Sequence, residues 1–193
     1  MRRLLLVLIA LSSLTACNGA NMNDNDPDDK PMPTARSEAG GIEVWDLTGA
    51  PSAEAFGIPD DKAAGIYETQ QPRTVRFVLP DGVELTVEST LVTFERFGEG
   101  DDARYTFGIR TAQLEPDALV STYRDVLGQL QVPTDVADKL AAEIAGAPKD
   151  QTEHIIVGSA EASSGDLKIG AQADIAPIAG SGPVIIGGSW QKG

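Results

Sequence analysis

Residues 74–88 read TVRFVLPDGVELTVE, and this stretch decides the fold class. Apolar and polar side chains alternate in both of its arms, and Pro80, Asp81 and Gly82 between the arms are residues typical of a turn. Alternation with a period of two indicates strands that bury one face only. Two such arms joined by a turn signal predict a β-hairpin.

A second hairpin is predicted directly downstream. Its first arm, acidic tip and second arm lie at residues 91–97, 98–103 and 104–111. Upstream, residues 42–47 begin the folded part, with Trp45 as the expected buried anchor. Residues 48–72 are rich in Ala, Gly and Pro, and we expect loops there with a short helical turn near residues 60–67.

Beyond the hairpins the apolar residues recur at helical spacing. The first helical stretch has apolar residues at Leu119, Tyr123, Val126, Leu127 and Leu130, and the second has them at Val136, Leu140 and Ile144. Pro116 suits a first helical turn, Pro133 cannot continue the helix, and Thr134 suits the cap of the next one. Strands then return at residues 153–158, 167–175 and 184–190, with loops at 160–165 and 177–183.

The order of strands, two helices and strands predicts an α+β fold. We expect a mostly antiparallel sheet, built from two N-terminal hairpins and three C-terminal strands, with the central pair of helices covering one face. The ten aromatic residues all lie at or after Trp45. The core therefore belongs to a single globular domain, expected at residues 41–193.

The first 16 residues, MRRLLLVLIALSSLTA, have the three-part layout of a secretory signal peptide. Arg2 and Arg3 are basic, residues 4–11 form an apolar run, and small residues follow. The run is shorter than the roughly 20 residues of a stable membrane span. We expect this segment to direct export of the chain.

Residues 14–17, Leu-Thr-Ala-Cys, resemble the lipobox of bacterial lipoproteins, a resemblance confined to the first 17 residues. It implies cleavage between Ala16 and Cys17, and a diacylglycerol on the sulfur of Cys17. Acylation of the new amino group, with fatty acids such as palmitate, would complete a lasting membrane anchor in the cell envelope. Asn18 stands where an aspartate often retains lipoproteins in the inner membrane, which favours an outer membrane, facing the periplasm, in a bacterium with two membranes.

Residues 17–40 are expected to be the lipidated cysteine and a disordered acidic tether. After Cys17 the segment has no aromatic or β-branched aliphatic residue, so it cannot bury enough apolar surface to offset its chain entropy. The formal net charge of the whole chain is −14, which disfavours nucleic-acid binding because phosphates are repelled. With one cysteine, no intramolecular disulfide is possible.

Recognisable catalytic or cofactor motifs are not found, and we predict no cofactor. His154, the single histidine, is interpreted as a strand-edge residue, because neighbours in a strand point to opposite faces and Glu153 cannot readily orient it. No zinc site of the usual kind is predicted. Glu99, Asp101 and Asp102 at the second hairpin's tip are the candidates for a calcium site, although a solvated acidic turn explains them as well.

Three functions are compatible with these residues. The favoured one is a membrane-anchored envelope lipoprotein whose domain is a non-enzymatic binding or scaffolding module acting on an unknown envelope protein. The second is an envelope hydrolase that uses an unrecognised carboxylate pair. The third is a carrier of an apolar ligand held between sheet and helices. The small residues Gly170, Ala171, Ala173, Gly187 and Gly188 either line that space or permit close packing.

Overall fold

A computed structural model of the chain describes residues 33–191. Its strands are β1 (Arg36–Ala39), β2 (Ile42–Asp46), β3 (Ala64–Val78), β4 (Glu84–Phe97), β5 (Arg104–Arg110), β6 (Ile155–Gly158), β7 (Ala162–Ser164), β8 (Leu167–Ile175) and β9 (Val184–Trp190). Its helices are α1 (Pro116–Gln129) and α2 (Asp135–Gly146), with a 3-10 turn η1 at Gly100–Asp102.

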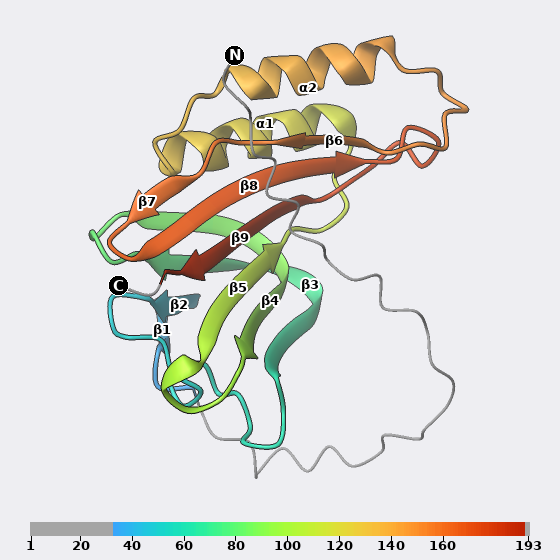
Figure 1. The fold of residues 1–193 in the computed structure, drawn as a ribbon. Helices are drawn as coiled ribbons and strands as arrows, with labels where there is room; N and C mark the ends of the chain where they lie inside the picture. Colours follow the sequence, from blue (N-terminus) through green and yellow to red (C-terminus); the bar gives the residue numbers. More distant parts are fainter. Residues whose placement is uncertain (1–32, 192–193) are drawn as a thin grey trace, which may run out of the picture.

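All nine strands belong to one sheet (Figure 1). Its order is β1-β2-β3-β4-β5-β9-β8-β6, and β7 also pairs with β8. In this part of the chain β2 and β3 are the parallel pair, and the other pairings are antiparallel. The predicted α+β class with a mostly antiparallel sheet is confirmed.

The structure corrects the prediction of two separate N-terminal hairpins. β4 runs without interruption through both, so β3, β4 and β5 form a three-stranded meander. The register shifts between Glu68 and Arg73, where the long β3–β4 pair bends. Ser89 is buried at this bend, where its hydroxyl lies within hydrogen-bond distance of the carbonyl oxygens of Leu91 and Arg110, 2.9 and 3.0 Å away.

The predicted loop and helical turn before residue 72 are wrong from Ala64 onward. β3 begins there, because its first residues pair with the far half of β4, Ala64 opposite Glu95 and Ile66 opposite Thr93. Pairing between distant segments thus overrides the weak local pattern. The folded part also begins before residue 41. β1 lies within the segment assigned to the tether, and Gly40 and Gly41, both at positive φ, turn the chain back into β2.

The helical pair lies across one end of the sheet (Figure 1). Pro116 is at the first turn of α1, Thr134 precedes α2, and the predicted apolar residues of α1 are buried. Tyr123 of α1 is fully buried, and its hydroxyl lies 3.5 Å from the carbonyl oxygen of Ala171 in β8. None of the described helices is long and apolar enough to cross a membrane.

Where the helices do not cover the inner face of the sheet, the sheet bends and its own side chains pack against one another. Trp45 has no exposed surface, which confirms it as a buried anchor, and its ring lies 4.6 Å from that of Phe94. Phe56 stacks on Phe94 at 4.2 Å. Each such fully buried large side chain contributes about 1.5–3 kcal/mol.

The three C-terminal strands lie where they are predicted, but a fourth is added. β7 lies in the predicted loop 160–165 and pairs with the start of β8, while β6 pairs with its end. Along β8, therefore, β6 and β7 share one edge. A three-residue strand is too short for a sequence pattern to indicate.

Candidate functional site

The candidate site is a groove of about 400 Å³ at one end of the sheet. Three segments far apart in the sequence line it: the β3–β4 turn at 79–83, the α1–α2 connection at 130–133, and residues 160–164 leading into and through β7, together with Ile169. They converge at the left of Figure 1. We call this feature the loop groove.

Apolar side chains form the floor of the loop groove. Leu79, Leu130 and Ile169 line it while being at most 4% exposed as whole residues. Around them lie exposed polar side chains, among which Asp81 and Glu161 are acidic. A concave surface with an apolar floor and a few polar groups is the usual construction of a ligand site.

The C-terminal end of helix α1 fixes the position of one wall of the groove. The amide of Gln131 donates to the carbonyl of Gly128, and that of Val132 to Leu127, both at 3.1 Å, which is the Schellman pattern. Gln131 therefore has φ 56°, and it is the one non-glycine at positive φ in the stretch 33–191. Glycine usually occupies this position, because a Cβ there is strained. The groove thus retains a polar side chain at a conformational cost.

A side-chain hydrogen bond joins the other two walls. The hydroxyl of Ser164, in β7, accepts a hydrogen bond of 3.0 Å from the main-chain amide of Asp81, in the β3–β4 turn. Ser164 is 4% exposed. The β3–β4 turn and β7 are therefore held together at the buried floor of the groove, so that more than one segment fixes its shape.

A second groove, of about 420 Å³, lies between α1 and α2. Val120 and Ile144 line it and are only half-buried, and the exposed ion pair of Arg124 with Asp138 lies beside it at 2.7 Å. Its lining comes from the helical pair alone. The loop groove has the more deeply buried floor and the more varied polar rim, so it is the stronger candidate.

The small residues proposed for a carrier cavity do not line the loop groove. Ala171 and Ala173 are buried in β8, where α1 packs, and Gly170 pairs with Gly187 across β8 and β9. A Cβ on Gly188 would lie 2.3 Å from the ring of Phe107. At Gly188 the missing Cβ permits close packing, which was the alternative interpretation of the sequence.

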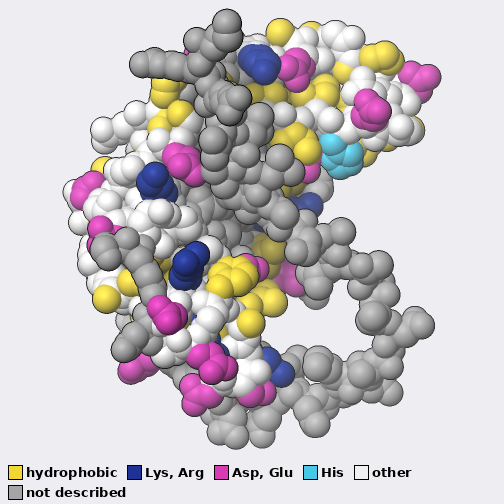
Figure 2. Space-filling view, in the orientation of Figure 1, with side chains coloured by type: hydrophobic (Ala, Val, Ile, Leu, Met, Phe, Trp, Pro, Cys, Tyr) yellow, Lys and Arg dark blue, Asp and Glu magenta, His cyan; other side chains and the backbone are white. Residues whose placement is uncertain are grey.

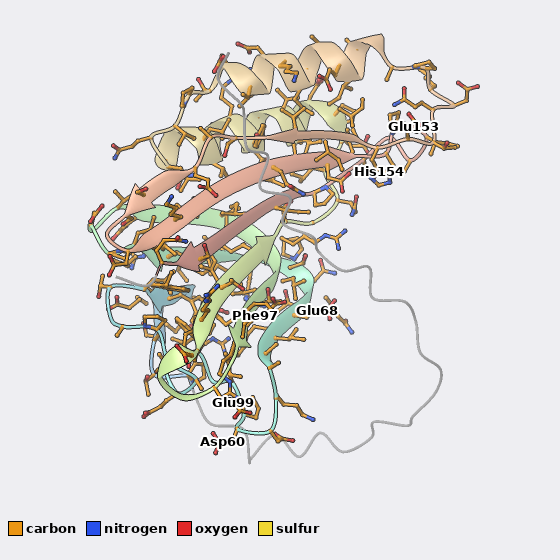
Figure 3. All side chains as sticks on the ribbon, viewed as in Figure 1. Asp60, Glu68, Phe97, Glu99, Glu153 and His154 are labelled. Carbon is orange, nitrogen blue, oxygen red and sulfur yellow. The ribbon has the colours of Figure 1, made fainter. Side chains whose placement is uncertain are left out.

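The predicted anchor residues Ala16 and Cys17, and Asn18, lie outside the described residues. Glu99 precedes η1 at the tip between β4 and β5, and Asp101 and Asp102 lie within η1. The described residues contain no group of three His, Cys, Asp or Glu that is placed to hold a metal ion. Figure 3 shows Glu99 at the opposite end of the domain from His154.

His154 has a partner that the sequence analysis missed. Its Nδ1 lies 2.5 Å from Oδ1 of Asp174 in the neighbouring strand β8, and its side chain is 54% exposed. Glu153 is not that partner, as expected. An oriented imidazole has the chemistry of a general base, but the pair is at the far end of the sheet from the loop groove (Figure 3).

A buried carboxylate on β2 was also missed. Glu43, 9% exposed, lies 2.6 Å from Nε of Arg73 and 3.0 Å from Arg36, and it accepts a 2.6 Å hydrogen bond from the indole of Trp45. The guanidinium of Arg36 also lies over the ring of Tyr67 at 5.4 Å. The signal was present, because Glu43 and Trp45 are two residues apart and share a face of the strand.

The shifted pKa values belong to two tyrosines and one exposed aspartate, all outside the loop groove. Burial raises the pKa of Tyr123 to about 12. Burial also raises the pKa of Tyr67, and the positive charge of Arg36 offsets part of this rise. Hydrogen bonds from the side chain and main chain of Thr48 lower the pKa of Asp46. None of these three groups lines the loop groove, so they favour a structural role.

Exposed apolar side chains elsewhere form a weaker candidate. Ile66, Phe97 and Ile156 are 64%, 52% and 58% exposed, on β3, β4 and β6. Figure 2 shows a small hydrophobic patch in the middle of the view, with acidic and basic side chains around it, in the region where Figure 3 labels Phe97. Single exposed apolar residues are common on protein surfaces.

Comparison with known proteins gives no match. No model of a protein family fits the chain, and no curated protein or solved structure is similar enough to count as a match. The function is therefore inferred from the geometry of the loop groove and from the sequence.

Proposed function

We propose that this chain is a membrane-anchored bacterial envelope lipoprotein whose folded domain is a non-enzymatic binding module. Lipid on Cys17 is the anchor, and the loop groove is the binding site. The observation that carries the binding role is the groove itself, an apolar floor enclosed by three segments and rimmed by polar side chains.

The chemistry around the groove supports binding rather than catalysis. Its rim has carboxylates, hydroxyls and an amide, but the one histidine of the chain is not among its lining residues. Asp81 and Glu161 both lie exposed to solvent, unlike the acid of a glycosidase pair, which is commonly held in an apolar pocket. A hydrolase that uses these two carboxylates is therefore disfavoured.

The anchor is tested in the bacterial host with a fatty-acid probe. The parent protein should take up the probe and fractionate with membranes, and the Cys17→Ser variant should do neither. A Ser12→Ala variant, which changes the signal segment but keeps the cysteine, is the control. Equal labelling of the parent and the serine variant would exclude the anchor.

The binding role is tested by cross-linking in intact cells. A photoreactive residue replaces Ser163 in the groove, or Lys139, which is exposed on α2 outside the groove. We expect a discrete adduct from position 163 that is absent from position 139. If position 163 yields the uncross-linked monomer alone, the proposed role of the loop groove in binding an envelope partner in the cell is wrong.

The carrier of an apolar ligand is a second candidate, favoured by the buried side chains of the groove floor. A bound lipid would be extracted with the protein and detected by mass spectrometry. A groove-filling variant, Val132→Trp, would then lose the lipid, while Val120→Trp between the helices would retain it. Lipid held equally by both variants would place it outside the loop groove.

A further inference from the structure

We propose that the loop groove binds an extended, basic segment of another protein, which adds to β7 as a further strand. This inference rests on the proposed function, since it names the ligand class of the same site. Three observations carry it: the free edge of β7, the apolar floor beside that edge, and the uncompensated acidic rim.

The edge of β7 is built to accept a strand. β7 pairs with β8 alone within the described part of the sheet, and it lies off the main path of strands. Ser164 pairs with Leu167 across a two-residue turn, and the pairs of an antiparallel ladder alternate between bonded and unbonded. The main-chain N–H and C=O of Ser163 therefore point away from β8, where an added strand can pair with them.

The floor of the groove lies beside that edge. An extended peptide paired with Ser163 places alternate side chains on opposite faces, so every second one can turn toward Leu79, Leu130 and Ile169. Main-chain pairing gives affinity to such a complex, and the apolar contact gives specificity. An apolar residue near the middle of the bound segment is therefore required.

The rim determines the charge of the segment. Asp81 and Glu161 are exposed, their carboxylates make no ion pair or hydrogen bond within residues 33–191, and the groove lining contains no lysine or arginine. Basic residues flanking the apolar one would meet these two carboxylates. A second copy of this chain is a poor occupant, because each copy has a formal net charge of −14.

Gln131 adds a polar group at the groove that a glycine could not supply. It keeps the left-handed conformation that normally selects glycine, and its exposed amide can both donate to and accept from a peptide main chain. We therefore assign Gln131 to peptide binding, and its replacement by glycine should weaken the complex without unfolding the domain.

The proposal is tested by panning a display library of random decapeptides on purified residues 18–193. We expect enrichment of sequences with an apolar centre flanked by Lys or Arg. The enriched peptide, made synthetically with a fluorophore, is titrated by anisotropy. Failure to enrich any sequence, or enrichment of acidic ones, overturns the proposal.

Matched charge variants locate the site. The Asp81→Asn, Glu161→Gln double variant should weaken the enriched peptide about three- to tenfold, because each exposed pair contributes little. The Asp150→Asn, Glu153→Gln double variant removes the same charge from exposed positions outside the groove and should bind like the parent. Equal weakening by both pairs indicates attraction by net charge only and contradicts the assigned site.

The main-chain pairing is tested without altering the protein. Methylation of one peptide amide at a time should weaken binding about three- to tenfold at alternate positions, because an added strand pairs through every second residue. Uniform insensitivity to methylation rejects strand addition. If the peptide results hold while cross-linking from position 163 in cells fails, the groove chemistry is right and the proposed cellular role is wrong.

Discussion

The side-chain amide of Gln129, at the end of α1, pairs with both main-chain polar groups of Thr86 in β4. Oε1 accepts from the amide of Thr86 at 2.7 Å, and Nε2 donates to its carbonyl at 3.2 Å. β5 pairs with β4 only from Leu91 onward, so this part of β4 has no strand on that side. One glutamine side chain thus replaces a neighbouring strand and ties the helical pair to the sheet.

Replacing Gln129 by alanine should lower the free energy of unfolding by about 1 kcal/mol, since the two hydrogen bonds are exposed and water replaces them in part. Urea titration followed by tryptophan fluorescence measures the change. Gln191→Ala, which removes an exposed amide bonded only to a serine side chain, is the control. Equal stability of Gln129→Ala and parent would mean that the contact contributes nothing.

Gln131→Gly should raise the free energy of unfolding by about 0.5–1 kcal/mol, because glycine adopts φ 56° without the Cβ strain. Gln131→Ala keeps the strain and should be no more stable than the parent. Thermal and urea unfolding of the three proteins check the order. A destabilised glycine variant would show that the side chain stabilises the fold and is not retained for binding.

Glu43→Gln should cost about 2 kcal/mol, because Arg73 and Arg36 lose their common counter-charge while Arg73 stays largely buried. The estimate is below that for a fully buried pair since both guanidiniums reach solvent. Glu38→Gln on β1, where the carboxylate is exposed, should leave stability unchanged. The two variants are compared by urea titration, and similar midpoints would rule out the buried cluster.

Stability should fall above pH 10 in a way that depends on Tyr123. Burial raises its pKa to about 12 in the folded protein, while the unfolded chain ionises near the ordinary value of 10.0. Its contribution is complete below pH 10 and is lost as the pH rises through 12, by about 3 kcal/mol in total. Tyr123→Phe should show a smaller fall between pH 9 and 12. Parallel pH profiles for the two proteins would contradict this.

Gly188→Ala should destabilise the domain by about 1–3 kcal/mol, because the added methyl group overlaps the buried ring of Phe107. Gly128→Ala in α1 meets no atom within 4 Å and should stabilise by about 0.5–1 kcal/mol. Calorimetry of both variants gives the two signs. A neutral Gly188→Ala would indicate free space beside β9, as the carrier hypothesis first assumed.

Features set by local chemistry were predictable from the sequence. Pro116 and Pro133 mark the ends of the helices, and the strict alternation of residues 167–175 defines β8. Thr134 is at the predicted cap position of α2, although its side chain makes no capping hydrogen bond. Each signal acts within a few residues, so no knowledge of the rest of the chain is needed.

Features set by distant pairing were not predictable. β4 continues through Ser89 because carbonyl groups in two strands satisfy its hydroxyl, and Asp174 reaches His154 from another strand. The loop groove escaped prediction for the same reason, because its walls, at 79–83, 130–133 and 160–164, are far apart in the chain and meet through contacts such as Ser164 with Asp81. No pattern in the sequence assigns the groove residues to a common site.

The place of β9 in the sheet has a consequence for how the chain folds. β9 lies between β5 and β8, pairing Phe107 with Gly188 and Ala171 with Ile186, although it is the last of the strands within residues 33–191. Until the ribosome has released residues 184–190, no strand joins the two halves of the sheet, and such non-local topologies form slowly. The complete sheet, and with it a stable domain, therefore cannot form before residues 184–190 have left the ribosome.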